Sequence, residues 1–373
     1  MSSGIRQTDV FVVGGGPAGL AAAIAARNCG FAVMLADSAQ PPIDKACGEG
    51  IMPDGLAALK KLGVTVPLET AAPFQGIRFS DGASAAQARF PRECGLGVRR
   101  TTLHETLISK AAEVGVDMHW GARINGVTPD GVLMDGREVR CRWLVGADGH
   151  NSHVRHWAGL ESVYGTTSQR FGFRRHYRIA HWSEFVEVDW TKHGQLYITP
   201  TGPEEICVAF LTRDPRIRLE DAFEAFPEIQ SRLQGAASIT REQGAISAMR
   251  SLRRVYRGSC ALIGEASGSV DAITGEGLSM IFQQAVALAQ ALVRKHLSQY
   301  QAEHRRISRL PRIMATLMLQ MDRSPWLRAR ALHAFQAKPL LFTRMLTIHT
   351  GAVSPFALGV QETLSFGWHL VTA

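Results

Sequence analysis

The chain has 373 residues, of which 46% are hydrophobic and 20% are charged, a composition typical of globular proteins that excludes disordered and fibrous classes. Its six cysteines form no CxxC or CxxH pair, which argues against a zinc site and against a disulfide framework. The formal net charge of +8 is concentrated in residues 301–350, which contain nine basic and two acidic residues. Those basic residues alternate with Leu, Met and Phe, and no nucleic-acid module accompanies them, so we expect no nucleic-acid partner.

The N-terminal segment has the order strand, glycine-rich turn, helix. An apolar run, Val10–Val13, predicts a buried strand, and the Ala-rich segment that ends at Cys29 predicts a helix. Between them, Gly14 permits a tight turn, Gly16 lets backbone N–H groups approach a pyrophosphate, and Gly19 allows close packing of helix on strand. This pattern predicts a dinucleotide-binding turn, with a glycine-rich hairpin as the alternative.

A second predicted strand, Phe31–Ala36, strengthens this interpretation. It ends at Asp37, 18 residues beyond Gly19, where a carboxylate can accept a hydrogen bond from a ribose hydroxyl. The apolar stretch 10–26 has the length of a signal-peptide core, but it carries four glycines and a proline at the positions of the turn and no cleavage site follows it. We therefore expect an unprocessed cytoplasmic chain.

Two segments further along the chain indicate backbone close to a ligand. In Lys45-Ala46-Cys47-Gly48-Glu49-Gly50 two glycines flank a glutamate, which fits either a ligand-facing loop or a tight turn before the helix expected from Pro53. A later helix is expected to begin at Arg100, capped by Thr101 or Thr102. Because Arg99 and Arg100 are adjacent, they point in different directions, and we expect one of them to reach a cofactor.

The middle of the chain alternates between strand patterns. Residues 74–98 predict short strands, and the hairpin around Asp135-Gly136 leads to a strand that ends at Asp148-Gly149. Because ligands bind at the carboxyl ends of parallel strands, Asp148 is a candidate binding residue. Alternating runs from about 161 to 248 predict an antiparallel sheet, interrupted by one helix over Arg218–Leu233.

The strand–turn–helix logic returns near residue 260. Cys260–Ile263 predicts a buried strand, and a loop rich in glycine leads into a long Ala-rich helix, capped by Thr274 with Glu276 in its first turn. Beyond Tyr300 the pattern is helical and rich in Met, Leu and Phe. Three interpretations of that pattern stay open: core packing, a lining for an apolar substrate, or a basic amphipathic surface that rests on anionic lipid at the inner face of the membrane.

From Thr8 to Leu292 these motifs together resemble the flavoprotein oxidoreductases of the para-hydroxybenzoate hydroxylase and geranylgeranyl reductase superfamily. Arg100 with Leu103 and Leu107 is similar to that family's FAD-contacting helix start, and Gly146-Ala147-Asp148-Gly149 is similar to its DG motif, which is implicated in binding FAD and NAD(P)H. Gly264-Glu265-Ala266 with Gly275-Glu276-Gly277-Leu278 resembles its GD motif, in which the acid holds the ribityl chain and the helix N-terminus faces the flavin ring. The resemblance implies a cofactor-binding set of Gly14, Gly16, Pro17, Ala18, Gly19, Asp37, Lys45, Cys47, Gly48, Arg100, Asp148, Gly149, Gly264, Glu265, Gly275, Gly277 and Leu278.

The chain also departs from the family pattern. Glu265 replaces the usual Asp, Gly268 the histidine of aromatic hydroxylases, and Ala272 a proline beside the flavin. The Cys47–Gly50 and Thr274–Gly277 motifs look more like geranylgeranyl reductases, and residues 267–278 are similar to flavoproteins of bacterial type III polyketide pathways. The halogenase motif Trp-x-Trp-x-Ile-Pro is absent, and Tyr197-Ile198-Thr199-Pro200 stands in the corresponding strand.

We therefore expect an α/β protein with a Rossmann-type FAD-binding domain, an inserted antiparallel-sheet substrate domain and a helical C-terminus. The expected boundaries are 1–72, 99–160 and 251–300 for the FAD-binding domain, 73–98 and 161–250 for the substrate domain, and 301–373 for the helical region.

The function that follows from the resemblance is an FAD monooxygenase, reduced by NADPH or NADH, that hydroxylates a hydrophobic aromatic or polyketide-like small molecule. The alternatives are an FAD-dependent reductase of C=C bonds in a prenyl or lipid chain, and a flavin-binding scaffold without turnover. Cys47, Glu49, Tyr197 and Asp271 are the side chains expected nearest the reacting centre, with Asp271 or Glu49 handling protons and with no metal site. Asp271 has a structural alternative, which is to cap a turn.

Overall fold

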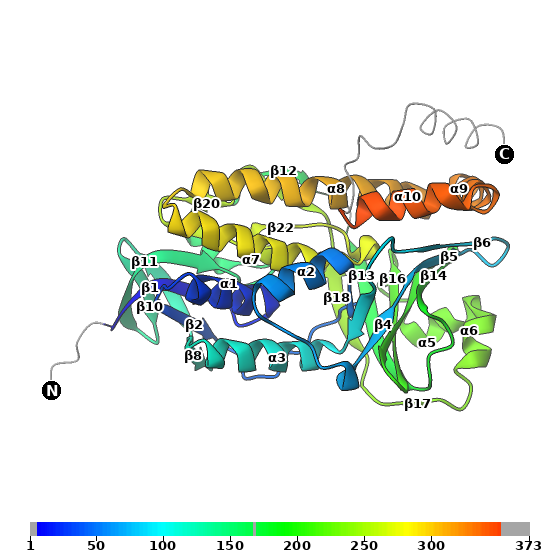
Figure 1. Ribbon diagram of the computed structural model, residues 1–373, viewed down its shortest axis with the longest axis horizontal. Helices are drawn as coiled ribbons and strands as arrows, with labels where there is room; N and C mark the ends of the chain where they lie inside the picture. The colour runs from blue at the N-terminus through cyan, green and yellow to red at the C-terminus, as the bar shows by residue number, and fades with distance from the viewer. Residues whose placement is uncertain (1–5, 167–168, 352–373) are drawn as a thin grey trace.

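The computed structural model describes residues 6–166 and 169–351. Two large sheets lie side by side along the long axis of the molecule, and a layer of C-terminal helices runs along one side of both (Figure 1). The expected α/β fold class, with parallel and antiparallel sheets and C-terminal helices, is confirmed.

The first sheet is built around the N-terminal strand. Its order is β20-β21-β11-β1-β2-β8, in which β21, β11, β1, β2 and β8 run parallel to one another and β20 is antiparallel to β21. Strand β10 forms the expected antiparallel hairpin with β11, and β9, which was not predicted, pairs antiparallel with β10. The bounds are β1 Arg6–Val13, β2 Val33–Asp37, β8 Asp117–Trp120, β9 Ile124–Thr128, β10 Gly131–Met134, β11 Arg137–Gly146, β20 Tyr256–Arg257 and β21 Cys260–Leu262.

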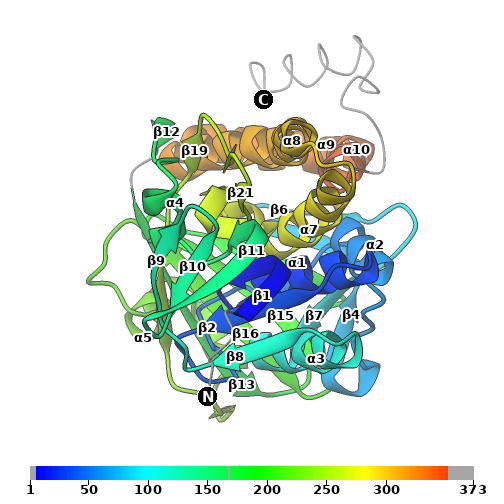
Figure 2. The same cartoon turned by 90° about the vertical axis from the view of Figure 1, so that its left-hand side faces the viewer.

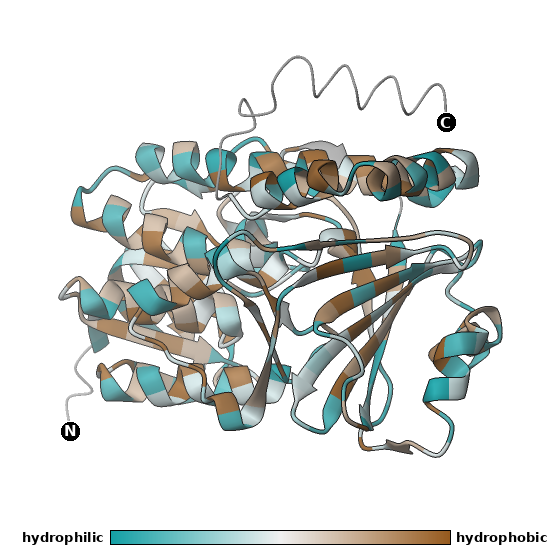
Figure 3. Cartoon of the chain, turned by 45° about the vertical axis from the view of Figure 1, so that its right-hand side comes forward, coloured by the Kyte–Doolittle hydropathy of each residue, from teal (hydrophilic) through white to brown (hydrophobic). Residues whose placement is uncertain are grey.

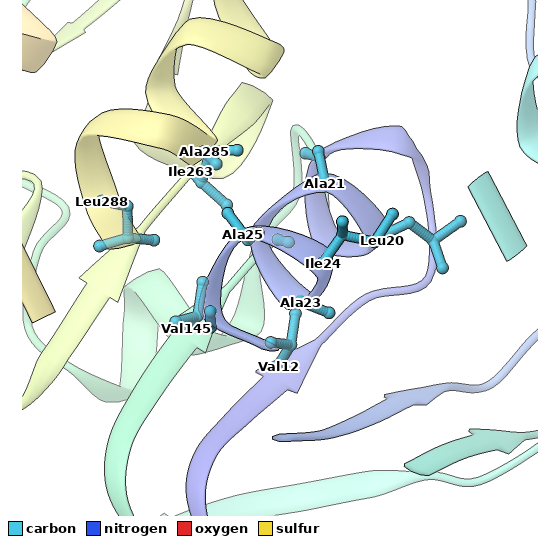
Figure 4. Close-up of a cluster of buried hydrophobic side chains, with 14 of the residues drawn as sticks. Val12, Leu20, Ala21, Ala23, Ile24, Ala25, Val145, Ile263, Ala285 and Leu288 are labelled. Atoms are coloured by element: carbon cyan, nitrogen blue, oxygen red, sulfur yellow. The ribbon is translucent and has the colours of Figure 1, made fainter. Parts of the chain in front are cut away.

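Three helices pack around this sheet. Helix α1 (Pro17–Asn28) contains no residue larger than Ile or Leu up to its last turn, so it can lie buried between the sheet and helix α7 (Gly277–Val293). Figure 4 shows Val12 and Val145 of the strands below α1, and Ala285 and Leu288 of α7 beside it. Helix α3 (Arg100–Glu113) contacts another side of α1 (Figure 2). The glycine-rich turn between β1 and α1 is therefore fixed in position, because the strand before it and the helix after it are both packed in the core.

The second sheet has the order β17-β13-β16-β15-β14-β5-β6, with β18 also paired to β13. Its strands from residues 170–247 pair antiparallel, as expected, and Figure 3 shows apolar and polar residues alternating along them. The parallel pairing of β14 with β5 joins residues 185–189 to 76–80 and was not predicted. The bounds are β5 Gly76–Ser80, β6 Ala85–Arg89, β13 Arg170–Arg178, β14 Phe185–Trp190, β15 Gly194–Gly202, β16 Glu205–Thr212, β17 Ala237–Ser238 and β18 Gln243–Ser247.

Smaller elements connect the two sheets. Two three-stranded sheets have the orders β3-β7-β4 and β12-β19-β22. The single helix expected over Arg218–Leu233 is wrong: the segment divides into α5 (Leu219–Ala222), a 3₁₀ turn and α6, because Pro227 cannot continue a helix and instead starts α6. The remaining bounds are β3 Gly50–Ile51, α2 Pro53–Lys61, β4 Ala71–Phe74, β7 Gly95–Val98, α4 His153–Trp157, β12 Val163–Thr166, α6 Pro227–Arg232, β19 Arg250–Leu252 and β22 Gly268–Ser269.

The C-terminal helices are α8 (Leu297–Arg323), α9 (Pro325–Ala337) and α10 (Pro339–His349). Helix α8 packs on α7, whereas α9 and α10 pack on β6, so the layer bridges both sheets. The helical expectation is confirmed through residue 349, and residues 352–373 of that region lie outside the described residues. Among the helices that the structure describes, none combines the length and apolar character needed to cross a membrane.

Candidate active site

A cavity of about 810 Å³ runs from the glycine-rich turn after β1 to the C-terminal helices. It is lined by every side chain or backbone position proposed from the sequence except one: Gly14, Gly16, Pro17, Ala18, Asp37, Lys45, Cys47, Gly48, Glu49, Arg100, Asp148, Gly149, Tyr197, Gly264, Glu265, Asp271, Gly275, Gly277 and Leu278. The exception is Gly19, which packs behind the turn. Residues separated by more than 250 positions thus meet around one space.

The three turn glycines have different roles. Gly14 has φ +108° and Gly19 faces the Gly14 carbonyl so closely that a Cβ there would lie 1.7 Å from its oxygen. Both positions therefore require glycine for the fold itself. Gly16 differs, because a Cβ built there would have only Arg100 Nη2 nearby, at 4.0 Å, and would project into the cavity. Its missing side chain leaves room for a ligand over the start of α1, where backbone N–H groups lack helical acceptors.

The two adjacent arginines separate as expected. Arg99 Nε lies 3.4 Å from Glu205 Oε1 on β16, whereas Arg100 lines the cavity. The expected cap of this helix is wrong: Arg99 is the N-cap residue and its side chain makes no cap hydrogen bond, because Thr101 and Thr102 already lie inside the first turn. Arg100 is thus placed to pair with an anionic ligand next to Gly16.

The carboxylates at the ends of the parallel strands hold backbone turns. Asp37 Oδ2 accepts from Gly15 N at 2.6 Å, and its Oδ1 accepts from Ala39 N at 2.8 Å. Asp148 accepts from Ser152 Oγ at 2.5 Å and from Val154 N at 3.0 Å. Each oxygen has a second lone pair, so both carboxylates can order their loops and still accept from a ligand hydroxyl.

Lys45 and Glu265 form a salt bridge of 2.6 Å at the cavity wall, with both side chains part-exposed. Glu265 is the residue that departs from the family's usual Asp. The longer side chain allows it to reach Lys45 in the loop that leads to Gly48, so the pair ties that loop to the segment after β21.

Glu49 is buried and has φ +60°, a backbone conformation that side-chain-bearing residues rarely adopt. Its carboxylate accepts from Arg100 N at 3.0 Å and bonds His176 Nε2 at 2.6 Å, while its carbonyl accepts from Val98 N at 3.0 Å. Both carboxylate oxygens are therefore engaged in holding the Cys47–Gly50 loop against α3 and β13, which favours a positioning role over proton transfer.

The partners of Glu49 form a buried polar network. His176 Nδ1 lies 3.1 Å from Arg174 Nη1, which only donates, so His176 accepts there and donates from Nε2 to Glu49. Cys207 lies close enough for Glu49, His176 and Cys207 to be ligands of one cation. Burial, however, raises the pKa of the Cys207 thiol well above its ordinary value, and the Arg174 guanidinium is 3.8 Å from Glu49. A protonated thiol and a neighbouring positive charge favour a hydrogen-bonded network over a metal site.

Tyr197 and Asp271 are also held by protein partners. The Tyr197 hydroxyl donates to the Ile273 carbonyl at 2.9 Å, and burial raises the pKa of Tyr197. Asp271 Oδ1 pairs with Arg170 Nη1 at 2.9 Å and accepts from Ile273 N at 3.0 Å. The alternative that Asp271 caps a turn is thus realised. Cys47, the remaining side chain of the four expected nearest the reacting centre, is half-buried and lines the cavity. Its sulfur accepts a hydrogen bond from Glu49 N at 3.4 Å.

The start of α7 differs from the expectation. Thr274 belongs to a 3₁₀ turn, and Glu276 is the N-cap residue of α7. Gly275 has φ +69°, and a Cβ on Gly277 would meet no atom within 4 Å. As at Gly16, the helix N-terminus therefore opens onto the cavity, and its N–H groups can stabilise negative charge on a ligand.

The pairing of two buried groups near this helix start was missed from the sequence. Glu276 Oε1 lies 3.5 Å from His349 Nδ1 at the end of α10, and Glu276 Oε2 and His349 Nδ1 make no hydrogen bond within the described residues. Burial raises the pKa of Glu276 well above its ordinary value, with Asp54 adding to the shift, and lowers the pKa of His349 to about 4. The pair therefore favours a carboxylic acid beside a neutral imidazole, and of the two side chains His349 lines the cavity. Glu276 was visible in the glycine motif, but no sequence signal links it to His349.

The far end of the cavity is apolar. It lies between the second sheet and the C-terminal helices, and His349 is the sole ionisable residue among the cavity-lining side chains that the described part of those helices contributes. The others are Met314, Leu317, Met318, Met321, Phe335, Phe342, Met345 and Leu346. Flexible Met side chains adapt to ligands of irregular shape, so this chamber suits a large apolar molecule.

Comparisons with known proteins agree with this geometry. A menaquinone reductase from Mycolicibacterium smegmatis is 37% identical over 174 residues, a match that covers 43% of this chain and only 42% of that enzyme. An aurachin C monooxygenase/isomerase from Stigmatella aurantiaca is 26% identical over 309 residues, covering 76% of this chain and 80% of that one. The solved structure of a flavoprotein/dehydrogenase from Cytophaga hutchinsonii shares the fold with a TM-score of 0.82 over 98% of both chains, at 18% identity.

The residues present fit FAD. Gly16 leaves an open cradle at the start of α1, Arg100 supplies a cation beside it, and Gly277 leaves a second helix N-terminus uncovered. The family described as FAD binding domain matches residues 7–308, the segment that contains all of these positions. The chain therefore belongs to the FAD-binding-domain family.

Proposed function

We propose that the protein is an FAD-dependent monooxygenase that hydroxylates a large apolar molecule with an aromatic or polyketide-like ring, and that NADPH or NADH reduces its flavin. The observation that carries the proposal is the single cavity that joins the cofactor cradle to an apolar chamber of Met and Phe side chains. Bound FAD supplies hydride uptake and oxygen activation. The protein's own contribution is to bind, orient and exclude water.

Each part of that contribution has residues to perform it. Gly16 and Arg100 would hold the pyrophosphate, and Asp37 the ribose. The N–H groups at Gly275 and Gly277 would face the ring and stabilise its negative charge when reduced. The apolar chamber would hold the substrate ring and keep water from the reacting atoms.

Reduction of a C=C bond in a prenyl or lipid chain is the second candidate. It is favoured by the match to a menaquinone reductase and by Cys47, which lines the cavity within the loop that resembles geranylgeranyl reductases. His349, which lines the cavity beside Glu276, would supply the proton for such a reduction, and FAD, when bound and reduced, would supply the hydride.

Stopped-flow spectroscopy separates the two reactions. The FAD-loaded protein is reduced without oxygen by NADPH or NADH, and then mixed with alkyl-substituted phenols or with menaquinone, once with air and once without. Faster oxygen uptake with the phenols and a hydroxylated product support the monooxygenase. A hydrogenated product formed without oxygen, with no oxygen uptake stimulated by substrate, contradicts it and supports the reductase.

A further inference from the structure

The outer face of α8 is basic. Its exposed positions recur every three or four residues and include Arg305, Arg306, Arg309 and Arg323. The described residues of the C-terminal helices contain two acids: Glu303 pairs with Arg306 at 2.8 Å, and Asp322 is buried against Arg213. Arg309 and Arg323 have no ion-pair partner among the residues that the structure describes, so their charges are available to an external anion.

The same surface exposes large apolar side chains. Among the described residues, four of the eight exposed large hydrophobic side chains lie in this one layer: Ile313 (47%), Leu317 (47%), Trp326 (61%) and Leu340 (74%). Trp326 lies beside Arg330, whose guanidinium carbon is 4.3 Å from the ring centroid. Arginine and lysine combined with exposed Trp and Leu on one helical surface are typical of helices that lie in a membrane interface.

This surface is also the outer wall of the cavity. Leu317 is exposed and lines the cavity, so one side chain separates the apolar chamber from the outside. Met314, about one turn before Leu317, and the adjacent Met318 line the chamber as well. The helices form a continuous layer along one side of the molecule (Figures 1 and 3), which could lie flat on a surface.

We propose that the outer face of α8, α9 and α10 docks on an anionic lipid membrane and that an apolar substrate passes from the bilayer into the chamber beside Leu317. The arginines bind lipid phosphates, and Ile313, Trp326 and Leu340 insert among the acyl chains. Docking itself does not depend on the reaction; the passage of substrate rests on the proposed function. Nucleic acid fits this surface less well, because its apolar residues are mostly aliphatic and cannot stack with bases.

The test is co-sedimentation of the FAD-loaded full chain with vesicles of phosphatidylcholine, with or without phosphatidylglycerol. We expect binding to the anionic vesicles alone, and weaker binding at high salt. Each Arg at a membrane surface accounts for about a fivefold change in partitioning, so R309Q/R323Q should bind about 25-fold more weakly.

K60Q/K61Q is the matched control. Lys60 and Lys61 are exposed at the end of α2, outside the C-terminal helices, and Gly63 next to them lies against Lys110 of α3. Figure 1 shows α3 on the side of the molecule away from α8. This variant should bind as the unmodified protein does. Equal binding to both vesicle types, unchanged binding of R309Q/R323Q, or an equal loss in K60Q/K61Q would overturn the proposal.

Two further readouts separate docking from turnover. Trp326→Phe should remove most of the fluorescence change on vesicle binding, and an unaltered change would contradict insertion of this residue. Reduction of the flavin by NADPH without vesicles should be the same in R309Q/R323Q as in the unmodified protein. If NADPH reduces the flavin in neither protein, that result would count against the proposed function and leave the docking result intact.

Discussion

Replacement of Gly16 by Val separates cofactor binding from folding. Gly16 has φ −70° and ψ 179°, an extended conformation open to any residue, and a Cβ there has Arg100 Nη2 as its nearest neighbour at 4.0 Å. We therefore expect the unfolding free energy of the FAD-free protein to change by no more than about 1 kcal/mol. The Val methyl groups would fill the space needed for close approach of a pyrophosphate to the start of α1. Losing one or two charge-assisted hydrogen bonds costs about 3 kcal/mol, so FAD should bind at least ~100-fold more weakly.

Gly19→Ala is the contrasting variant. Its Cβ would lie 1.7 Å from the Gly14 carbonyl oxygen, so the turn itself must move, and we expect loss of folding stability as well as of FAD. Calorimetric titration of FAD into the apoprotein, with urea unfolding of the same preparations, measures both quantities. FAD affinity unchanged in Gly16→Val would refute the assignment of the pyrophosphate to this turn, and unfolding of Gly16→Val would refute the open cradle.

Substitutions at three other sites test the buried polar groups. Burial raises the pKa of Asp54 from 3.8 to about 6, so the folded state holds the proton of this carboxyl more tightly than the unfolded chain does. The unfolding free energy should therefore fall by roughly 3 kcal/mol as the pH rises from about 4 to 6. Asp54→Asn should remove that fall in urea unfolding measured across this pH range, and an unchanged dependence on pH would contradict the prediction. Arg170→Met leaves Asp271 buried without its cation and should lower the unfolding free energy by about 3–5 kcal/mol. The double variant R170M/D271N should recover part of that loss. If the losses of the two single variants simply add in the double variant, the two side chains do not act as a pair. Glu49→Ala should lower the unfolding free energy by about 3 kcal/mol, because it leaves Arg100 N–H and His176 without their hydrogen-bond partner. The loss in Glu49→Gly should be about 1 kcal/mol smaller, because glycine adopts φ +60° without strain. Equal losses in both variants would show that the backbone conformation contributes nothing.

The parts of the fold predicted from the sequence are those with local causes. The strand, turn and helix around Gly14, Gly16 and Gly19 follow from an apolar run, three glycines and an Ala-rich stretch that are contiguous. The parallel pairing of β14 with β5 depends instead on contacts between residues about 110 positions apart, which no local pattern encodes. The break in the expected helix at Pro227 could have been predicted from the sequence, because proline seldom continues a helix.

The candidate site divides in the same way. Glycine motifs indicated most of the positions that line the cavity, because a missing side chain is itself a local signal. Hydrogen-bond partners were not readable: Glu49, Tyr197 and Asp271 could be named as polar groups near the centre, but not as groups already engaged by His176, Ile273 and Arg170. The pairing of Glu276 with His349 needs the end of α10 to lie beside the start of α7, which depends on tertiary packing alone.

The most direct test of the proposed monooxygenase is the source of the oxygen atom in its product. The FAD-loaded protein is supplied with NADPH, an alkyl-substituted phenol and ¹⁸O₂ in ordinary water, and the product is analysed by mass spectrometry. We expect one ¹⁸O atom in each hydroxylated molecule. A product that contains no ¹⁸O, or that has instead gained two hydrogen atoms, would contradict it.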